Sequence, residues 1–287
     1  MSKFRFLLLF CLSFFSITAN ANFVFNENCI KAYKNILSLK FNEGALQLAQ
    51  EKKTNPNNKI PVLLENYIDF LKVLTTENNA SFENFKSNKS ARISIIEDDD
   101  KRSPWYLYAA AEINLQSCIN RFKYLEFVSG AYELQKAYKL LEENQKKFPD
   151  FLPNKKSFAL LYGLIGLVPE QYKWALSSIG LKGNTEQGAA MLEDLTQKLP
   201  KSNYAYFYDE SAFFLSFIYL SKEGDPAIYD KVKLVCDAVP KTNLLGVYVK
   251  ALAASKTGHT DDAIEILMER PKTPNYAAFY HLDYLLG

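Results

Sequence analysis

Few residues in this 287-residue chain have the types and spacing of catalytic groups. Gly183 and Gly188 have the spacing of the two glycines in a phosphate-binding loop. However, Ala189 and Ala190 stand where that loop needs Lys and then Ser or Thr. The sequence also has no Gly-x-Ser-x-Gly motif of the kind that holds a hydrolase nucleophile. A hydrolase would need a triad assembled only in space, so we expect no enzyme and no cofactor.

The histidines and cysteines give little basis for a metal site. His259 and His281 are not at metal-ligand spacing from each other or from a cysteine. Beyond residue 21 the chain has Cys29, Cys118 and Cys236. A disulfide between Cys29 and Cys118 is possible in an exported protein, although an odd number leaves at least one thiol free. The alternative is that all three are reduced, buried, small apolar residues.

The N-terminus has the pattern of a secretory signal peptide. Lys3 and Arg5 precede an apolar run from Phe6 to Ile17, and Ala19-Asn20-Ala21 matches a small-x-small cleavage site. We predict that residues 1–21 are removed and that the protein is periplasmic or secreted. Cys11 lies inside the apolar run without a small residue before it, so we expect no lipid anchor.

The net charge of the chain gives no support for nucleic acid as a partner. The sequence has 34 basic and 32 acidic residues, and the predicted signal peptide holds two of the basic ones and no acidic one. The mature chain is therefore neutral, and nothing in its charge favours nucleic acid or an anionic membrane surface. No later apolar stretch reaches the ~18 residues of a membrane span.

The elements that position the side chains are predicted to be helices. Apolar residues recur at helical spacing along most of the chain, and no strand-like alternation stands out. Two such stripes are Ile30, Tyr33, Leu37, Phe41 and Leu64, Tyr67, Ile68, Leu71, Leu74. Proline- and glycine-containing breaks divide the chain into roughly twelve helices, and the fold class is therefore all-α.

The breaks follow a repeating pattern. A small residue is followed four positions later by an aliphatic residue and, about eight positions further on, by a proline. The small residues are Gly44, Ala137, Gly188 and Ala263, and the prolines include Pro149, Pro200 and Pro240. In a tetratricopeptide-type hairpin the small residue allows close helix crossing and the proline ends the second helix. We predict one helical-repeat domain over residues 22–287, with divergent hairpins in 22–150 and better-matched repeats in 151–287.

One segment, Ser157 to Leu195, resembles the signature of the tetratricopeptide repeat protein 39 family, which includes the fungal inclusion body clearance proteins. Matching positions are Gly163, Leu167, Pro169, Gly180, Gly183, Glu186 and Gly188, whereas Leu181 and Asn184 replace a Phe and an Asp. The run from Tyr206 to Glu210 also resembles the aromatic-Glu helix start of that family. The resemblance implies a tetratricopeptide-like superhelix without known catalytic residues.

Aromatic residues are the candidate binding groups, because tyrosine buries area yet keeps a polar tip. The candidate partner-facing side chains are Tyr204, Tyr206, Tyr208, Glu210, Trp105 and Tyr108. For any single one of them the sequence favours a structural interpretation, in which the aromatic side chains fill grooves between helices and Glu210 is buried with partners. The function predicted first is an exported scaffold or adaptor that binds a protein or peptide on its curved surface. A glycan- or small-ligand-binding envelope protein is the alternative, and a hydrolase is the third.

The end of the chain has an unusual composition. Residues from Tyr276 to Gly287 are apolar and aromatic on several faces, with no polar capping helix of the kind that solenoids need for solubility. We expect this end to dock against a groove of the chain or against a partner.

Overall fold

The structure is a computed structural model that describes residues 22–98, 101–168, 174, 176–177, 179–181, 183–222 and 224–287. The predicted signal peptide, residues 1–21, lies outside the described residues, as does Pro169 of the family resemblance. Within the described ranges, the regular elements are thirteen α-helices and two 3₁₀-helices, without strands, which confirms the all-α prediction.

The helices alternate with short turns. They are α1 (Glu27–Leu37), α2 (Phe41–Thr54), α3 (Ile60–Thr76), α4 (Asn79–Glu97), α5 (Pro104–Lys123), α6 (Phe127–Lys147), α7 (Leu152–Gly166), α9 (Thr185–Lys198), α10 (Tyr208–Leu220), α11 (Ile228–Cys236), α12 (Leu244–Lys256), α13 (Thr260–Met268) and α14 (Tyr280–Leu286). The 3₁₀-helices are η1 (Leu199–Lys201) and η2 (Ala205–Phe207), between α9 and α10.

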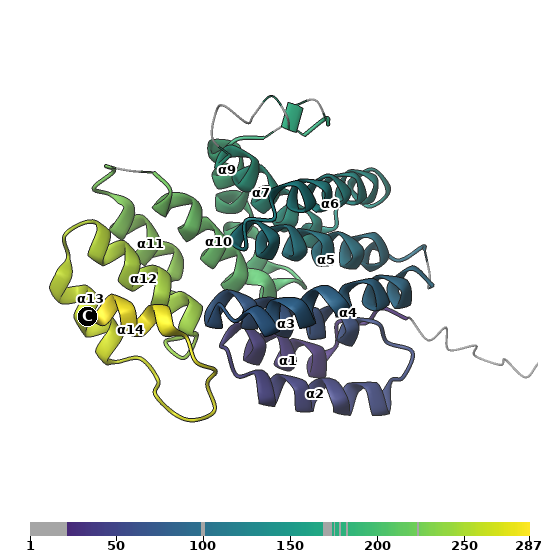
Figure 1. Cartoon of the computed structure of the whole chain (residues 1–287), viewed down its shortest axis with the longest axis horizontal. Coiled ribbons are helices and arrows are strands. Elements are labelled where there is room, and N and C mark those ends of the chain that lie inside the picture. The colour runs from purple at the N-terminus through teal and green to yellow at the C-terminus, as the bar shows by residue number, and fades with distance from the viewer. Residues whose placement is uncertain are drawn as a thin grey trace, which may run out of the picture.

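Consecutive helices pack in pairs: α1 with α2, α3 with α4, α5 with α6, α7 with α9, α10 with α11 and α12 with α13. The first members of these pairs also pack on one another in chain order, from α1 to α12. We call α1, α3, α5, α7, α10 and α12 the inner helices. Figure 1 shows the pairs following one another around the molecule.

The inner helices are buried on more sides than the outer helices α2, α4, α6, α9, α11 and α13, because other inner helices also cover them. In α5, the run Ala109–Asn114 is buried at every position. In its outer partner α6, burial is confined to one stripe that includes Leu134, Ala137 and Leu141. This stripe has the helical spacing expected of an amphipathic surface helix.

Small residues stand where paired helices cross closely. A Cβ added at Gly44 of α2 would lie 2.6 Å from Ile36 Cγ1 of α1, and one at Gly188 of α9 would lie 2.7 Å from the Ala159 carbonyl oxygen of α7. The alanines at the corresponding positions, Ala137 and Ala263, are buried. Such contacts explain why the sequence places glycine or alanine there.

Prolines follow the outer helices, as the spacing predicts. Pro149 comes directly after Phe148, the C-cap of α6, and Pro200 lies in η1 immediately after α9. Pro240 follows α11 after a short turn. Proline stops a helix because it lacks an N–H donor and clashes with the preceding turn.

The C-terminal segment returns to the first helices. We call residues 271–286 the C-terminal strap. The Ala277 N–H donates to the Leu39 carbonyl, at 2.8 Å, and α14 packs on both α3 and α12. Leu282 of α14 is buried. The end of the chain therefore docks on its own α1–α2 turn and on α3, and the inner helices are not left as an open concave face.

Candidate functional site

Side chains change character in the same order along four inner helices. In α3, α5, α7 and α10, residues that carry a charge or a buried hydroxyl precede residues that line an apolar cavity. In α3, for example, Tyr67 precedes Phe70 and Leu74, and in α10 Glu210 precedes Phe214. These helices therefore run in the same direction, with the polar groups on the N-terminal side of a cavity that lies toward their C-terminal ends.

An aromatic layer covers the N-terminal ends of the inner helices, and several predicted binding residues lie in it. The Phe25 ring stacks on Tyr206 with centroids 4.5 Å apart, and Trp105 lies 5.3 Å from Phe25 and 6.3 Å from Tyr204. Tyr208 is separate, because its hydroxyl donates to the Val235 carbonyl of α11 at 2.9 Å.

Burial corrects the prediction that all these side chains face a partner. Trp105 is 8% exposed, Tyr108 is 0% exposed and Glu210 is 4% exposed, so none of the three offers a surface. Tyr204, Tyr206 and Tyr208 are half-buried. Trp105, Tyr108 and Glu210 are buried because the inner helices pack on one another, so a side chain that lies between two of them becomes part of the core.

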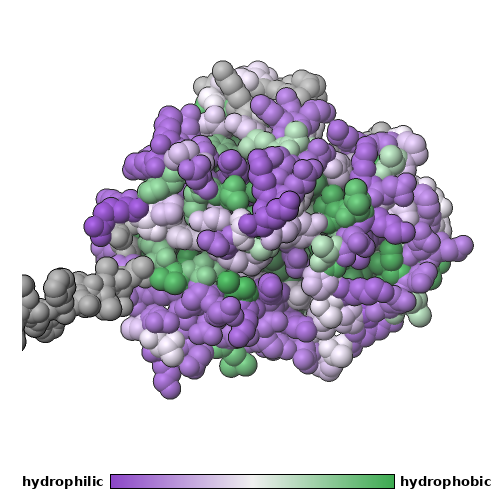
Figure 2. Space-filling view, turned by 180° about the vertical axis from the view of Figure 1, so that it is seen from behind, coloured by the Kyte–Doolittle hydropathy of each residue, from purple (hydrophilic) through white to green (hydrophobic). Residues whose placement is uncertain are grey.

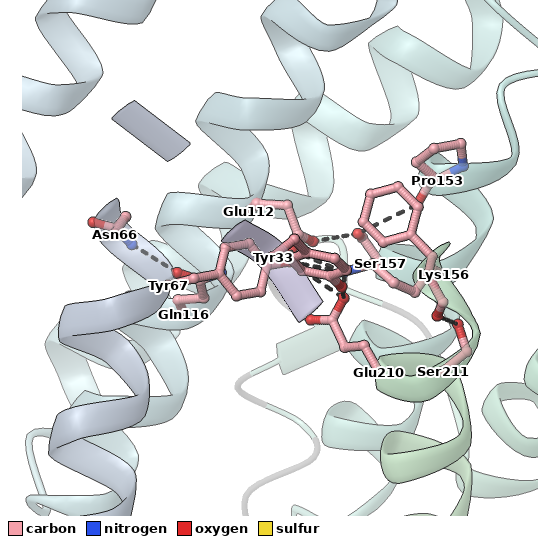
Figure 3. Close-up of polar contacts among 11 residues, drawn as sticks. Tyr33, Asn66, Tyr67, Glu112, Gln116, Pro153, Lys156, Ser157, Glu210 and Ser211 are labelled. Atoms are coloured by element: carbon pink, nitrogen blue, oxygen red, sulfur yellow. Dashed lines mark hydrogen bonds and ion pairs between the residues drawn. The ribbon is translucent and has the colours of Figure 1, made fainter. Parts of the chain in front are cut away.

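Glu210 instead belongs to a charged cluster between the inner helices. We define this cluster as Tyr33, Tyr67, Glu112, Lys156, Ser157 and Glu210 (Figure 3). Lys156 Nζ lies 3.0 Å from Glu112 Oε2 and 2.7 Å from Glu210 Oε2. The hydroxyl of Tyr33 donates to Glu210, and those of Tyr67 and Ser157 donate to Glu112. Lys156 Nζ also donates to the Tyr67 hydroxyl at 3.1 Å.

Burial and neighbouring charges shift the pKa values of Glu210 and Lys156 in this cluster. Burial raises the pKa of Glu210, the nearby Lys156 charge opposes that shift, and the charge of Glu112 adds to it. Burial lowers the pKa of Lys156, but the charges of Glu112 and Glu210 raise it by more, so the ammonium stays charged. When Glu210 holds its proton, the cluster is neutral overall, which is the state that a low-dielectric interior favours.

The phenols remain hydrogen-bond donors in this setting. Burial raises the pKa of Tyr33 and of Tyr67 well above the ordinary value, and the adjacent glutamates raise both further. Lys156 is 0% exposed, so the centre of the cluster has no contact with solvent. Its members come from α1, α3, α5, α7 and α10, so its role in this structure is to join five inner helices.

An apolar cavity of about 180 Å³ lies beside this cluster, toward the C-terminal ends of the inner helices. Its wall includes Phe70 and Leu74 of α3, Ile119 of α5, Leu160 and Leu164 of α7, Phe214, Phe217 and Ile218 of α10, Leu245 and Tyr248 of α12, and Phe279 of the C-terminal strap. Thr75 also lines it, but its hydroxyl donates to the Leu71 carbonyl at 2.8 Å. The wall thus offers mainly apolar contact.

Two charged or polar side chains, Lys123 and His281, line the cavity and meet Glu77 at its rim. Lys123 Nζ lies 2.6 Å from Glu77 Oε1, and His281 Nε2 lies 3.1 Å from the same oxygen. A hydrogen bond from Lys123 and its positive charge lower the pKa of Glu77, so the carboxylate is ionised. We call Glu77, Lys123 and His281 the rim group.

The three cysteines are separate core residues in the structure. Cys29, Cys118 and Cys236 are all free and buried, so Cys29 and Cys118, for which the sequence left a disulfide as one of two possibilities, are not bonded to each other here. Cys29 faces Asn58, with Sγ 3.7 Å from Nδ2, and burial raises the pKa of Cys29 to about 12. Within the described part of the chain, no group of three or more His, Cys, Asp or Glu side chains is placed to hold a metal ion.

Sequence reasoning missed Lys156, Glu112 and the rim group. Glu112 carried a usable signal, because it follows three alanines within a helix and a buried carboxylate requires a partner. Lys156 carried none, since Lys155-Lys156 at a helix start has the pattern of an exposed surface. The rim group joins residues that are 46 and 204 positions apart, which no local pattern indicates.

Comparisons of the chain with protein-family models, with curated proteins and with solved structures find no match. In the residues that the structure describes, no helix combines the length and the apolar character needed to cross a membrane. The described part of the chain is all-helical, and its helices pack in adjacent pairs.

Proposed function

We propose that this chain is a binding protein that holds a small apolar molecule, or the apolar tail of a larger one, between its inner helices. One observation carries the proposal: the cavity of about 180 Å³, whose wall is contributed by five inner helices and the C-terminal strap. This function is the small-ligand alternative predicted from the sequence. The function predicted first was a scaffold that binds a protein or peptide.

The energetics of packing support a ligand. The cavity is partly open to solvent, and Phe217 in its wall is 46% exposed, so apolar surface contacts water when no ligand is bound. Removing apolar surface from water contributes about 25 cal/mol per Å². A bound apolar group would cover this wall and gain that contribution.

Size limits the ligand. A cavity of ~150 Å³ lined by apolar side chains accepts benzene. The cavity here therefore suits a single ring or about six carbons of an alkyl chain, with any polar group left at the rim. Larger multi-ring molecules and sugars fit poorly, because the wall offers few free polar groups to pair with hydroxyls.

Octan-1-ol tests this function without a charge on the ligand. We expect it to raise the melting temperature of the protein by about 2–4 °C at concentrations ten times its Kd, since it binds only the folded state. Leu164→Trp places a larger side chain in the cavity and should abolish the shift. Leu46→Trp, at an exposed position on α2, is the matched control and should retain it. No shift in the wild type, or an equal shift in Leu164→Trp, would overturn the proposal.

Three finer features of the sequence analysis remain part of this proposal. The helix pairing supports a tetratricopeptide-like repeat array, related to the tetratricopeptide repeat protein 39 family, that has closed on itself. The N-terminal pattern supports export to the periplasm or beyond the cell. No group in the charged cluster or the cavity supports a catalytic role, so we do not propose an enzyme.

Binding of a protein partner is a second proposal, and a specific surface favours it. Leu125, Phe127, Val128 and Tyr132, at the α5–α6 turn, are large apolar residues that are all exposed, with Val128 at 88%. Exposed apolar groups this close together are typical of interaction surfaces. Figure 2 shows, for one face of the molecule, that apolar residues reach the surface in separate patches among hydrophilic ones.

Affinity capture from the envelope fraction tests the second proposal. A partner of this surface should be retained by the wild type and by Leu46→Asp, and lost with Val128→Asp. If no protein shows this dependence, the α5–α6 turn is not a binding surface.

A further inference from the structure

We propose that the ligand of the cavity is an amphiphile with a carboxylate head, and that Lys123 and His281 bind this head at the rim. This inference rests on the proposed function and adds the chemical class of the ligand. An alkyl tail of about six carbons would fill the apolar cavity, and the carboxylate would lie where the rim group now stands.

The geometry of the rim group supports an anion. Lys123 comes from the end of α5 and His281 from α14, yet both place a nitrogen next to the same atom, Glu77 Oε1, at 2.6 and 3.1 Å. A carboxylate oxygen already occupies the point where the two groups converge. The side chain of Glu77 thus shows which chemistry this point accepts.

Lys123 and His281 differ from Glu77 in their relation to the cavity. Both are part of the cavity wall, whereas Glu77 is not. Their side chains are 26% and 36% exposed, and that of Glu77 is 54% exposed at a left-handed turn position, with φ of 51°, just after α3. The proposal requires the Glu77 side chain, the most exposed of the three, to turn into solvent while the two nitrogen-bearing groups stay at the mouth.

The charges of the cavity lining favour an anionic head group over a cationic or a neutral one. Among the described residues that line the cavity none is acidic, and Lys123 contributes a positive charge. A cationic head would meet the lysine ammonium directly. A neutral hydroxyl could accept a hydrogen bond from the ammonium, whereas a carboxylate would accept that bond and also gain the attraction between opposite charges.

The experiment compares octanoate with octan-1-ol by isothermal titration calorimetry at pH 7, where an aliphatic carboxylic acid is ionised. We expect octanoate to bind about tenfold more tightly to the wild type, a difference of ~1.4 kcal/mol. Lys123→Met should remove this preference, so that octanoate and octan-1-ol bind the variant with affinities within about twofold of each other. Lys53→Met, on the exposed face of α2, is the matched control and should behave as the wild type.

Glu77→Gln should change the affinity for octanoate in the opposite direction to Lys123→Met. It removes the competing negative charge but keeps the shape of the side chain, so octanoate should bind more tightly and octan-1-ol equally well. A purely structural rim group would instead weaken both ligands when Glu77 is changed.

The outcomes separate this inference from the function beneath it. If octan-1-ol binds but octanoate has no advantage, or Lys123→Met leaves the advantage intact, the carboxylate head is wrong and the apolar site stands. If neither ligand binds, the proposed function and this inference fall together.

Discussion

At the scale of single residues, the molecule depends on a lysine that has no access to water. Lys156 is held by two glutamates, and each glutamate also accepts from a tyrosine. Removing one partner of such a buried pair is costly because it leaves an uncompensated charge. Lys156→Met should therefore lower the free energy of unfolding by about 3–5 kcal/mol.

The raised pKa of Glu210 predicts a particular pH dependence. Because the folded state holds this proton more tightly than the unfolded state, the stabilisation is complete below the ordinary pKa of 4.5 and is lost as pH rises through the folded value. Glu210→Gln removes that loss, so its stability relative to the wild type should improve with rising pH. The gain is about 1.4 kcal/mol per unit of pKa difference.

Urea unfolding from pH 4 to pH 8 measures this effect in both proteins. A difference between wild type and Glu210→Gln that stays constant with pH, or that moves in favour of the wild type as pH rises, would contradict the assignment of the proton to Glu210.

Part of what the structure shows for these residues could be predicted from the sequence. Tyr33 and Tyr67 fall in predicted apolar stripes, so their burial could be predicted, but their hydroxyl partners could not. Tyr33 and Glu210 are 177 positions apart, and their contact depends on how several helices pack. Glu210 was recognised as a carboxylate among apolar residues, and the alternative in which it is buried with partners is the one that the structure shows.

At the scale of elements, α7 and α9 cross with their backbones in close approach. A Cβ at Gly188 would lie 2.7 Å both from the Ala159 carbonyl oxygen and from the Gly163 backbone nitrogen, neither of which can move independently of its helix. Gly163 is itself a cavity-lining residue, so this crossing also sets one part of the cavity wall. The small-residue spacing located such crossings from sequence because it follows local helix geometry.

Gly188→Ala should force α9 away from α7. We expect a loss of roughly 1–3 kcal/mol in the free energy of unfolding, the usual cost of overpacking, even though alanine favours a helix over glycine by ~1 kcal/mol. Gln187→Ala, the exposed neighbour on the same helix, is the control and should change stability by less than about 0.5 kcal/mol. A Gly188→Ala protein as stable as the wild type in urea would show that the crossing is looser than described.

At the scale of the whole molecule, the path of the chain creates the cavity. The inner helices run side by side, and the C-terminal strap returns to Leu39 and α3, bringing Phe279 and His281 to the cavity. The apolar composition of residues 276–287 predicted that this end would dock. The place of docking was not predictable, because it depends on the summed rotation of all the helix pairs rather than on any local pattern.

A crystal structure of the protein under xenon pressure tests the central claim most directly, because xenon enters dry apolar cavities without any head group. We predict xenon between Phe70 of α3, Leu160 of α7 and Phe214 of α10, and its loss in Leu164→Trp. Side chains collapsed into that space, or ordered water in place of xenon, would contradict a ligand site among the inner helices.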